Sequence, residues 1–548
     1  MHPNDSPLYY LANFQFVLAF IAARYKDLLA PPEQAFIQQF QALPRDAQAL
    51  LVRLIMRSRD VFIEDALNYV EISELRPALQ ALHTVGFIEQ NTDIGLEEVF
   101  CLCKKADILK AFSAAGLSAK QSKAEMLELL ELLSLRHSES KTLEDWLKLD
   151  GVCAVRLLVR PTVDTFRLLF FGNLYQDWSE FVITDLGHLR YEAIDIPETS
   201  RGFTSRTDLD TCLQLHELRI CLVAGEPIHE LFQRLPSDTS SLSPAVASRV
   251  AKFVFQLGQA AERGKDWLLA KTIYQACGYK GSRHRLLRVH EQLSNWPAAF
   301  ALAQAILLAP AGEDELQATR RALPRLARKL KQPVPITPEL IPAPTDSLHL
   351  NEAPTACVEV SVAEAISRDN RQVHYVENTL FSSLFGLVFW DAIFAPSPGA
   401  FFHPFQSGPA DLFHPDFASR RGNELAAGFE SLTFDDLAER LITRWQTKFG
   451  LQNPFVFWQE LDELLIEHAV SCIPRESLRA IFTRILADLK NHCSGFPDLI
   501  VFDTLELRYE LIEVKAPNDR VQDNQARWMD YFLRHDIPCR VVHVSWPT

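Results

Sequence analysis

The sequence predicts a multidomain protein with a mostly α-helical front end and a C-terminal α/β domain. A chain of 548 residues corresponds to roughly three or four domains of ordinary size. In the front end, apolar residues recur at helical spacing, as in Leu51, Leu54 and Ile55. The clearest strand patterns come near the C-terminus, at 498–502 and 509–515. The change of periodicity from helix to strand therefore places the α/β domain last.

The composition is that of a globular protein and argues against several classes. Hydrophobic residues make up 48% of the chain and charged residues 23%, which allows large cores. The net charge of −15 argues against a protein that coats nucleic acid nonspecifically, although local basic faces remain compatible with DNA binding. The ten cysteines are scattered, and Cys101 and Cys103 lack the further ligands of a structural zinc site. We expect free thiols in a reducing compartment.

No targeting or membrane segment is visible in the sequence. The first residues, Met1 to Asp5, lack the basic and apolar regions of a secretory signal. The strongest apolar stretch, Leu380 to Phe394, is too short to cross a bilayer and contains Asp391. We expect an intracellular protein, cytoplasmic and nucleoid-associated in a bacterium or nuclear in a eukaryote.

Residues 1–95 are expected to form a helical domain that resembles a DNA-binding winged helix. The helices are followed by Val85-Gly86-Phe87-Ile88, which indicates a tight turn into a strand. Many helical bundles show the same helical spacing. The resemblance to a winged helix therefore rests on the turn and the strand that follow the helices.

Residues 96–200 are expected to hold a SAP-like module and the strands that follow it. Two short amphipathic helices lie between 106 and 133, with Lys120 and Lys123 at the start of the second. This pattern is similar to a SAP module, a small hairpin that binds the DNA backbone, and makes both lysines candidate DNA contacts. An ordinary helical hairpin with solvated lysines is the alternative.

Residues 201–332 are expected to form tetratricopeptide-like helical repeats, because small residues recur at close-packing points without a strict period. A basic run between Arg320 and Lys331 reads as a solvated helix face, with a DNA-facing stripe as the alternative. Six prolines then fall within 332–355, which cannot continue a helix. We therefore expect the C-terminal domain to occupy 356–548.

Candidate catalytic residues lie on the two strand-like runs near the C-terminus. Asp498 follows Gly495-Phe496-Pro497, and Glu513-Val514-Lys515 ends the second run. Alternate side chains of a strand share a face, so Glu513 and Lys515 should point to the same side, beside Asp498. Two carboxylates and the Val514 carbonyl offer the oxygen ligands that Mg²⁺ or Mn²⁺ prefers. This pattern predicts metal-dependent hydrolysis of phosphodiesters, in which Lys515 positions water and stabilises charge.

The Glu-x-Lys and Pro-Asp motifs also occur elsewhere in the sequence, without strand-like apolar runs beside them. Glu139-Ser140-Lys141 lies in a polar stretch with no strand before it, and no apolar run follows Pro415-Asp416. Both copies are expected to be surface residues. His403 and His414 lie in a loop rich in Phe and Pro and are expected to be structural. No GxxxxGK[ST] phosphate loop is present in the sequence, which argues against an ATPase.

Longer motifs in this region resemble a known nuclease family. Gly-Phe-Pro-Asp-Leu from Gly495, Glu-Val-Lys-Ala-Pro-Asn-Asp-Arg from Glu513 and Gln-Ala-Arg-Trp from Gln525 are similar to the VRR-NUC domain of the PD-(D/E)xK superfamily. Glu377, the segment 379–387 and the Trp-Asp pair that follows look like the Fanconi-associated nucleases. The resemblance covers essentially the whole chain, in the order SAP, tetratricopeptide-type repeats and VRR-NUC.

The resemblance implies a metal site and a reaction. Its ligands to Mg²⁺ or Mn²⁺ would be Glu377, on the helix that opens the nuclease domain, with Asp498, Glu513 and the Val514 carbonyl. Lys515 would be the catalytic lysine and Gln525 a supporting polar residue. The implied protein is a monomeric 5′-flap endonuclease and 5′-to-3′ exonuclease that acts on branched or flapped DNA in interstrand crosslink repair.

Three departures and two alternatives accompany this interpretation. No ubiquitin-binding zinc finger is visible, which indicates a short, bacterial-type member. Cys493-Ser494 and Asn524 stand where the vertebrate pattern has basic residues, so a 5′-phosphate pocket is in doubt. The alternatives are a DNA-binding scaffold with weak or lost catalysis and a Holliday-junction resolvase, which would need a dimer. The intact Asp498, Glu513 and Lys515 argue against the scaffold.

Overall fold

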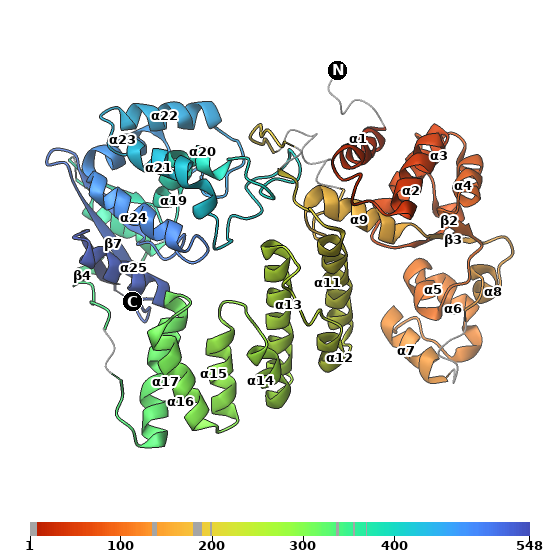
Figure 1. Ribbon diagram of the computed structural model, residues 1–548, viewed down its shortest axis with the longest axis horizontal. Coiled ribbons are helices and arrows are strands. Elements are labelled where there is room, and N and C mark those ends of the chain that lie inside the picture. The colour runs from red at the N-terminus through yellow and green to blue at the C-terminus, as the bar shows by residue number, and fades with distance from the viewer. Residues whose placement is uncertain are drawn as a thin grey trace. The chain divides into compact units, whose positions relative to one another are not determined.

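The computed structural model describes residues 8–133, 140–178, 189–197, 200–335, 339–354, 357–368 and 370–547. Packing divides the chain into two compact units (Figure 1). Unit 1 comprises Met1–Leu189 with Phe203–Leu209, and unit 2 comprises Arg190–Gly202 with Asp210–Thr548. Across the described part of the chain, no helix has both the length and the apolar character needed to cross a membrane.

The first half of unit 1 combines helices with a small antiparallel sheet, as expected for a winged helix. Among the described residues the sheet has three strands in the order β1-β3-β2. The turn predicted before Ile88 is present, and Gly86 adopts the left-handed conformation there. The elements are α1 (Tyr9–Arg24), α2 (Pro31–Ala42), α3 (Arg45–Ile55), β1 (Val61–Ile63), α4 (Leu75–Thr84), β2 (Ile88–Gln90), β3 (Ala154–Leu157) and α9 (Arg160–Phe171).

The helices predicted as a SAP-like module fall between β2 and β3 in the chain. They are α5 (Leu96–Leu102), α6 (Lys105–Ala111), α7 (Lys123–Leu133) and α8 (Leu143–Leu147), packed around a core that includes Val99, Ile108 and Met126 and extends to Val61 of β1 and Ala154 of β3. The first sheet is therefore completed by a strand beyond the boundary predicted at residue 95. A strand of four residues is too short to indicate which sheet it joins.

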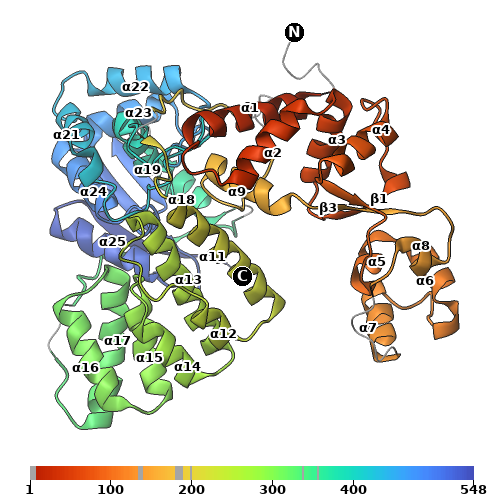
Figure 2. The ribbon, with the colours of Figure 1, turned by 45° about the vertical axis from the view of Figure 1, so that its right-hand side comes forward.

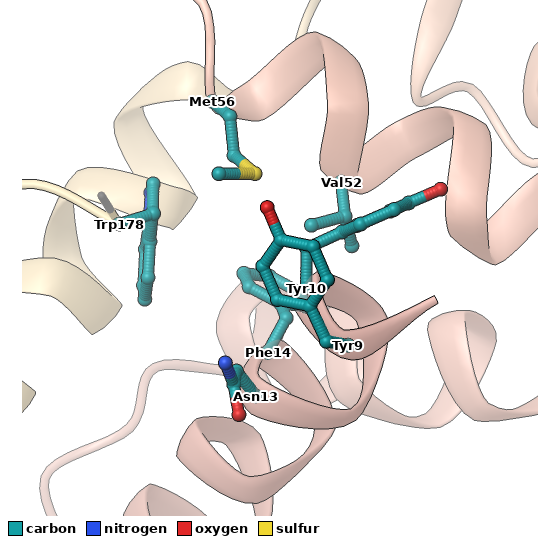
Figure 3. A pocket seen from close by; sticks show the side chains of 7 residues that line it. All are labelled: Tyr9, Tyr10, Asn13, Phe14, Val52, Met56 and Trp178. Carbon is teal, nitrogen blue, oxygen red and sulfur yellow. The ribbon is translucent and has the colours of Figure 1, made fainter. Parts of the chain in front are cut away.

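A small internal cavity lies within unit 1. Its volume is about 10 Å³, and its walls come from α1, α3 and the segment after α9 (Figure 3). Such a space holds no more than about one water molecule. The aromatic residues gathered here are therefore core packing and not a ligand site. The lining residues are Tyr9, Tyr10, Asn13, Phe14, Val52, Met56 and Trp178.

Unit 2 begins with consecutive helices that pack side by side (Figures 1 and 2). Small residues allow the close approach: Ala261 and Ala270 are fully buried, and Gly258 lies against the Tyr274 ring, where a Cβ atom would clash. This arrangement agrees with the predicted tetratricopeptide-like repeats. The helices are α11 (Arg206–Ala224), α12 (Ile228–Gln233), α13 (Pro244–Arg263), α14 (Trp267–Gln275), α15 (Ser282–Gln292), α16 (Trp296–Leu308) and α17 (Glu313–Leu330).

Three of the six basic side chains between Arg320 and Lys331 make an ion pair or a ring contact. Arg321 pairs with Asp523, and Arg325 pairs with Glu291 at 2.6 Å. Lys329 lies over the Trp296 ring. These contacts favour a structural role for the run over a DNA-facing stripe.

The C-terminal half of unit 2 is built on a mixed sheet. Within the described ranges it has five strands in the order β4-β8-β7-β6-β5, with β8 parallel to both neighbours and the other pairs antiparallel. The two strand-like runs found in the sequence form an antiparallel hairpin, closed by Asp503 opposite Arg508. The strands are β4 (Thr345–His349), β5 (Arg371–Tyr375), β6 (Leu499–Asp503), β7 (Arg508–Lys515) and β8 (Cys539–Ser545).

Two of these strands were not predicted. Both β4 and β5 are edge strands with mainly polar side chains, mostly exposed in β4 and half-buried in β5, so neither shows a clear apolar alternation. Because β4 pairs with β8, the sheet begins before residue 356, where the sequence analysis placed the domain boundary.

Helices cover both faces of the sheet. Ile500, Phe502 and Leu511 point into the larger core, and Val501 and Val514 point into a smaller one with Val362 of α18. The helices of this half are α18 (Val358–Ile366), α19 (Leu380–Val388), α20 (Trp390–Ile393), α21 (Gly422–Ser431), α22 (Leu437–Lys448), α23 (Glu463–Cys472), α24 (Arg475–Ala487) and α25 (Asp523–Arg534).

The two histidines of the loop rich in Phe and Pro have structural surroundings. His403 is fully buried and its Nδ1 accepts a hydrogen bond from the Phe405 amide, while burial lowers its pKa to about 3. His414 contacts Asp416, the acid of the second Pro-Asp pair. The structural roles expected for these residues agree with these contacts.

Charged contacts join the helical repeats to the α/β half of unit 2. Glu313, at the start of α17, accepts two hydrogen bonds from Arg484 of α24, at 3.0 and 2.6 Å, and lies 3.5 Å from His492. Burial alone would raise the pKa of Glu313, but His492 and Arg484 outweigh burial and hold the pKa at about 2. Its carboxylate is therefore more stable as an anion in the folded protein than in the unfolded chain.

We expect Glu313→Gln to destabilise unit 2 by about 1 kcal/mol at pH 7, a figure reduced from the pKa shift because the carboxylate is partly exposed. A depressed pKa gives stability that is present above the unfolded value of roughly 4.3 and is lost as pH falls toward 2. Urea unfolding at several pH values should show the difference between variant and parent shrinking through this range. Glu506→Gln, which removes an exposed ion pair with Arg508, is the control. A difference that does not change with pH would contradict the assignment.

Candidate active site

Asp498 and Glu513 face each other across the β6–β7 hairpin. The register pairs Leu499 with Ile512, and one further step along the antiparallel ladder places Asp498 opposite Glu513. Side chains at such positions have Cβ atoms roughly 5 Å apart. Both residues also lie on the face that carries Ile500 and Leu511 into the larger core. The hairpin thus brings the two predicted carboxylates together.

Both carboxylates are buried. Asp498 is 6% exposed and Glu513 is 0% exposed. Burial raises the pKa of each group, and the Asp498 carboxylate raises the pKa of Glu513 further. The Val514 amide opposes this effect at Asp498 by donating a hydrogen bond of 2.7 Å to Oδ2. Two anions this close in a dry environment need a compensating cation.

Lys515 supplies one cation on the same face. It is 4% exposed, and its Nζ lies 2.7 Å from Glu513 Oε1. Burial alone would lower the pKa of Lys515, but the neighbouring Glu513 carboxylate outweighs burial and raises the pKa. Lys515 is therefore held as an ammonium ion and acts as a positive charge beside the two acids.

The donor set fits a divalent metal ion. Among the described residues, neither Glu513 oxygen has a well-directed hydrogen bond, although both are fully buried. Within the described chain, Glu513 Oε1 has only its ion pair with Lys515, and these carboxylate oxygens, with Asp498 opposite, are the kind of ligand that Mg²⁺ and Mn²⁺ prefer. The ion would sit with Asp498 and Glu513, and the Val514 carbonyl stays a predicted third ligand.

Glu377 is not on a helix, which corrects the sequence prediction. It lies in a turn between β5, which ends at Tyr375, and α19, which begins at Leu380. Its carboxylate is near enough to raise the pKa of both Asp498 and Glu513. In the described part of the chain, however, no three acidic, histidine or cysteine side chains converge closely enough to hold a metal ion. The structure therefore brings Asp498, Glu513 and Lys515 together and leaves Glu377 at the margin.

Comparison with known proteins identifies the family. Residues 434–546 match the model of the VRR-NUC domain, and residues 8–89 match that of the FAN1, HTH domain. A Fanconi-associated nuclease 1 homolog of Pseudomonas aeruginosa is 40% identical over 546 residues, which cover 98% of this chain and 96% of that protein. The chain belongs to the Fanconi-associated nuclease family.

Solved structures and more distant relatives of this nuclease agree. A crystal structure of paFAN1 bound to DNA with a 2-nucleotide 5′ flap and a gap has a TM-score of 0.93, with 40% identity and 99% of each chain covered. Fanconi-associated nuclease 1 of Homo sapiens is 23% identical, and the match covers 98% of this chain but 62% of the human protein. The predicted fold class and family are confirmed, and the protein is a deoxyribonuclease.

The remaining predicted site residues of the nuclease have local structural contacts. Gln525 Oε1 accepts a hydrogen bond from the Gln522 amide at 2.8 Å and so caps α25. Lys123 donates to the carbonyl oxygens of Phe100 and Cys103, which end α5. Catalytic support by Gln525 and DNA contact by Lys120 and Lys123 stay predictions.

The segment before Asp498 depends on a left-handed glycine. Gly495 has φ +91°, and a Cβ atom there would lie 2.8 Å from Asn524 Nδ2. Asn524 thus packs against this turn, at the position where the vertebrate pattern has a lysine. Cys493, which precedes the turn, is mostly buried, and burial raises the pKa of its thiol to about 12.

Two further residues near the site were missed in the sequence. The Tyr375 hydroxyl donates to Glu377 Oε2 at 2.8 Å, and Asn378 Nδ2 donates to Oε1 at 3.1 Å. The only sequence signal was their proximity to Glu377, because neither residue type is itself a metal ligand of choice.

We expect Gly495→Ala to destabilise unit 2 by about 2–3 kcal/mol, since the added methyl group meets both backbone strain and Asn524. Gly225→Ala is the matched control: Gly225 has φ +87° and no atom within 4 Å of the added Cβ, so it reports the strain alone, about 1 kcal/mol. Urea unfolding of both variants measures the difference. Equal losses would show that the contact with Asn524 contributes nothing.

Proposed function

We propose that this deoxyribonuclease cleaves phosphodiester bonds at 5′ flaps, as an endonuclease with 5′-to-3′ exonuclease activity, using Mg²⁺ or Mn²⁺ held by Asp498 and Glu513. One observation carries the proposal: the hairpin register opposes two buried carboxylates beside Lys515. The similarity to a relative solved with 5′-flap DNA supports the substrate, since it extends over 99% of both chains.

Asp498, Glu513 and Lys515 have different roles in the proposed reaction. The Val514 amide binds Asp498 Oδ2 and so orients the carboxylate. The direction of the other oxygen, Oδ1, is therefore set by this backbone contact as well as by the side-chain rotamer. Glu513 presents two buried oxygens without well-directed hydrogen bonds. A bound divalent ion would orient the scissile phosphate and lower the pKa of a bound water. Lys515, held as an ammonium ion, would stabilise the negative charge that builds up on the phosphate.

We further propose that the protein acts as a monomer on branched DNA in interstrand crosslink repair. One chain carries a complete Asp498, Glu513 and Lys515 set, and a flap needs one cut. A Holliday-junction resolvase would instead need two symmetric sites. The proposed repair role rests on family membership, and the resemblance to flap-bound relatives supports it.

Asp498→Ala should abolish cleavage of end-labelled 5′-flap DNA, with a loss of at least about 10³-fold, because it removes one of two opposed carboxylates. The control is Asp416→Ala. Asp416 belongs to the other Pro-Asp pair, in the loop near His414, and this variant should retain activity. The assay compares 5′-flap, 3′-flap, four-way-junction and single-stranded DNA with either metal ion.

Cleavage should stop when a chelator removes divalent ions and return when Mg²⁺ or Mn²⁺ is added in excess. Full activity in the chelator would reject the metal site. Preferred cutting of four-way junctions by a dimer would favour the resolvase, and intact protein that binds flaps without cutting any substrate would favour a scaffold.

A further inference from the structure

Asn378 connects two segments of the active site that lie far apart in the chain. Its Nδ2 donates to Glu377 Oε1 at 3.1 Å. Its Oδ1 accepts hydrogen bonds from the amides of Gly495 and Phe496, at 2.7 and 3.2 Å. One amide side chain therefore holds the Glu377 carboxylate and the turn that leads to Asp498 at the same time.

The backbone at Asn378 makes this double contact possible. Asn378 has φ +56°, a left-handed conformation that asparagine tolerates better than most residues. The chain leaves β5 at Tyr375 and enters α19 at Leu380, so the conformation falls within the turn that carries Glu377. The change of direction there lets the side chain reach back to the Gly495 turn.

Glu377 is held at its carboxylate by Asn378 and by one other side chain, Tyr375. It stands two residues beyond the last paired residue of β5, and its other oxygen accepts from the half-exposed Tyr375 hydroxyl. The carboxylate is close enough to Asp498 and Glu513 to raise their pKa values, yet it does not complete a three-carboxylate cluster within the described residues.

We propose that Asn378 is a positioning residue that sets the Glu377 carboxylate relative to Asp498 and thereby determines the affinity of the site for its divalent ion. This inference rests on the metal site of the proposed function. Partners that orient a metal ligand commonly change metal affinity by about 10- to 100-fold when they are removed.

The fold should survive removal of the Asn378 side chain. The Val376 amide donates to the Asp498 carbonyl at 2.8 Å, and this backbone bond joins β5 to β6 without Asn378. Glycine adopts the left-handed conformation without strain, so Asn378→Gly removes the two side-chain contacts and keeps the turn. Asn91→Gly is the matched control, because Asn91 also has a positive φ, of 53°, and lies in unit 1.

The test measures Mn²⁺ binding to the full chain by calorimetry, without DNA, together with the Mn²⁺ concentration that gives half-maximal flap cleavage. We expect Asn378→Gly to raise both values about 10-fold, with near-normal cleavage at saturating Mn²⁺. Asn91→Gly should match the parent protein. Thermal unfolding without metal should show both variants folded.

A double variant tests whether Asn378 changes Mn²⁺ affinity through Glu377. If Asn378 acts through Glu377, adding Asn378→Gly to a Glu377→Ala protein should change Mn²⁺ affinity less than 2-fold, since coupled residues are not additive. A full further 10-fold loss would overturn the proposal, as would parental Mn²⁺ affinity in Asn378→Gly alone. Parental protein that binds no Mn²⁺, or binds it equally after Asp498→Ala, would instead reject the metal site of the proposed function.

Discussion

The opposition of Asp498 and Glu513 across the β6–β7 hairpin is the constraint on which the rest of the site depends. Two buried carboxylates on facing positions repel each other, and burial adds to the cost of ionising both. The protein meets this cost locally with the Val514 amide and the Lys515 ammonium group. These contacts leave the oxygens of Glu513 without well-directed hydrogen bonds among the described residues, which suits a divalent ion.

The neighbouring elements keep that hairpin in register. β8 lies beside β7 in the interior of the sheet, while β5 covers the outer edge of β6. Apolar side chains on both faces prevent a shift by one residue, because such a shift would exchange Ile500 and Val501 between the two cores. The left-handed residues Asn378 and Gly495 border the site and turn the chain sharply next to the acids. Of the two, only Asn378 carries backbone strain, and such strain is commonly kept where function requires a fixed geometry.

The sequence was informative where apolar patterning and chemistry coincided. β6 and β7 carry continuous buried runs, and the two-residue period alone placed Glu513 and Lys515 on one face. The polar edge strands β4 and β5 gave no such signal, and so the start of the sheet was predicted too late. The family resemblance implied that Glu377 lies on a helix, whereas α19 begins three residues later. Hydrophobic periodicity does not reveal the left-handed turn at Asn378 that separates them. In unit 1, β3 is separated from β2 by the SAP-like helices, and local patterns carry no information on pairing over such a distance.

The contacts made by basic side chains bear on how an acidic protein can act on DNA selectively. With a net charge of −15, the chain cannot depend on a broad cationic surface, since nonspecific affinity grows with the number of phosphates neutralised. Arg321, Arg325 and Lys123, which looked available for DNA in the sequence, are engaged by Asp523, by Glu291 and by backbone carbonyls. Engagement of these cations lowers their contribution to nonspecific binding. A weaker nonspecific attraction gives more weight to contacts that match a particular DNA shape, which is the property that a structure-specific nuclease needs.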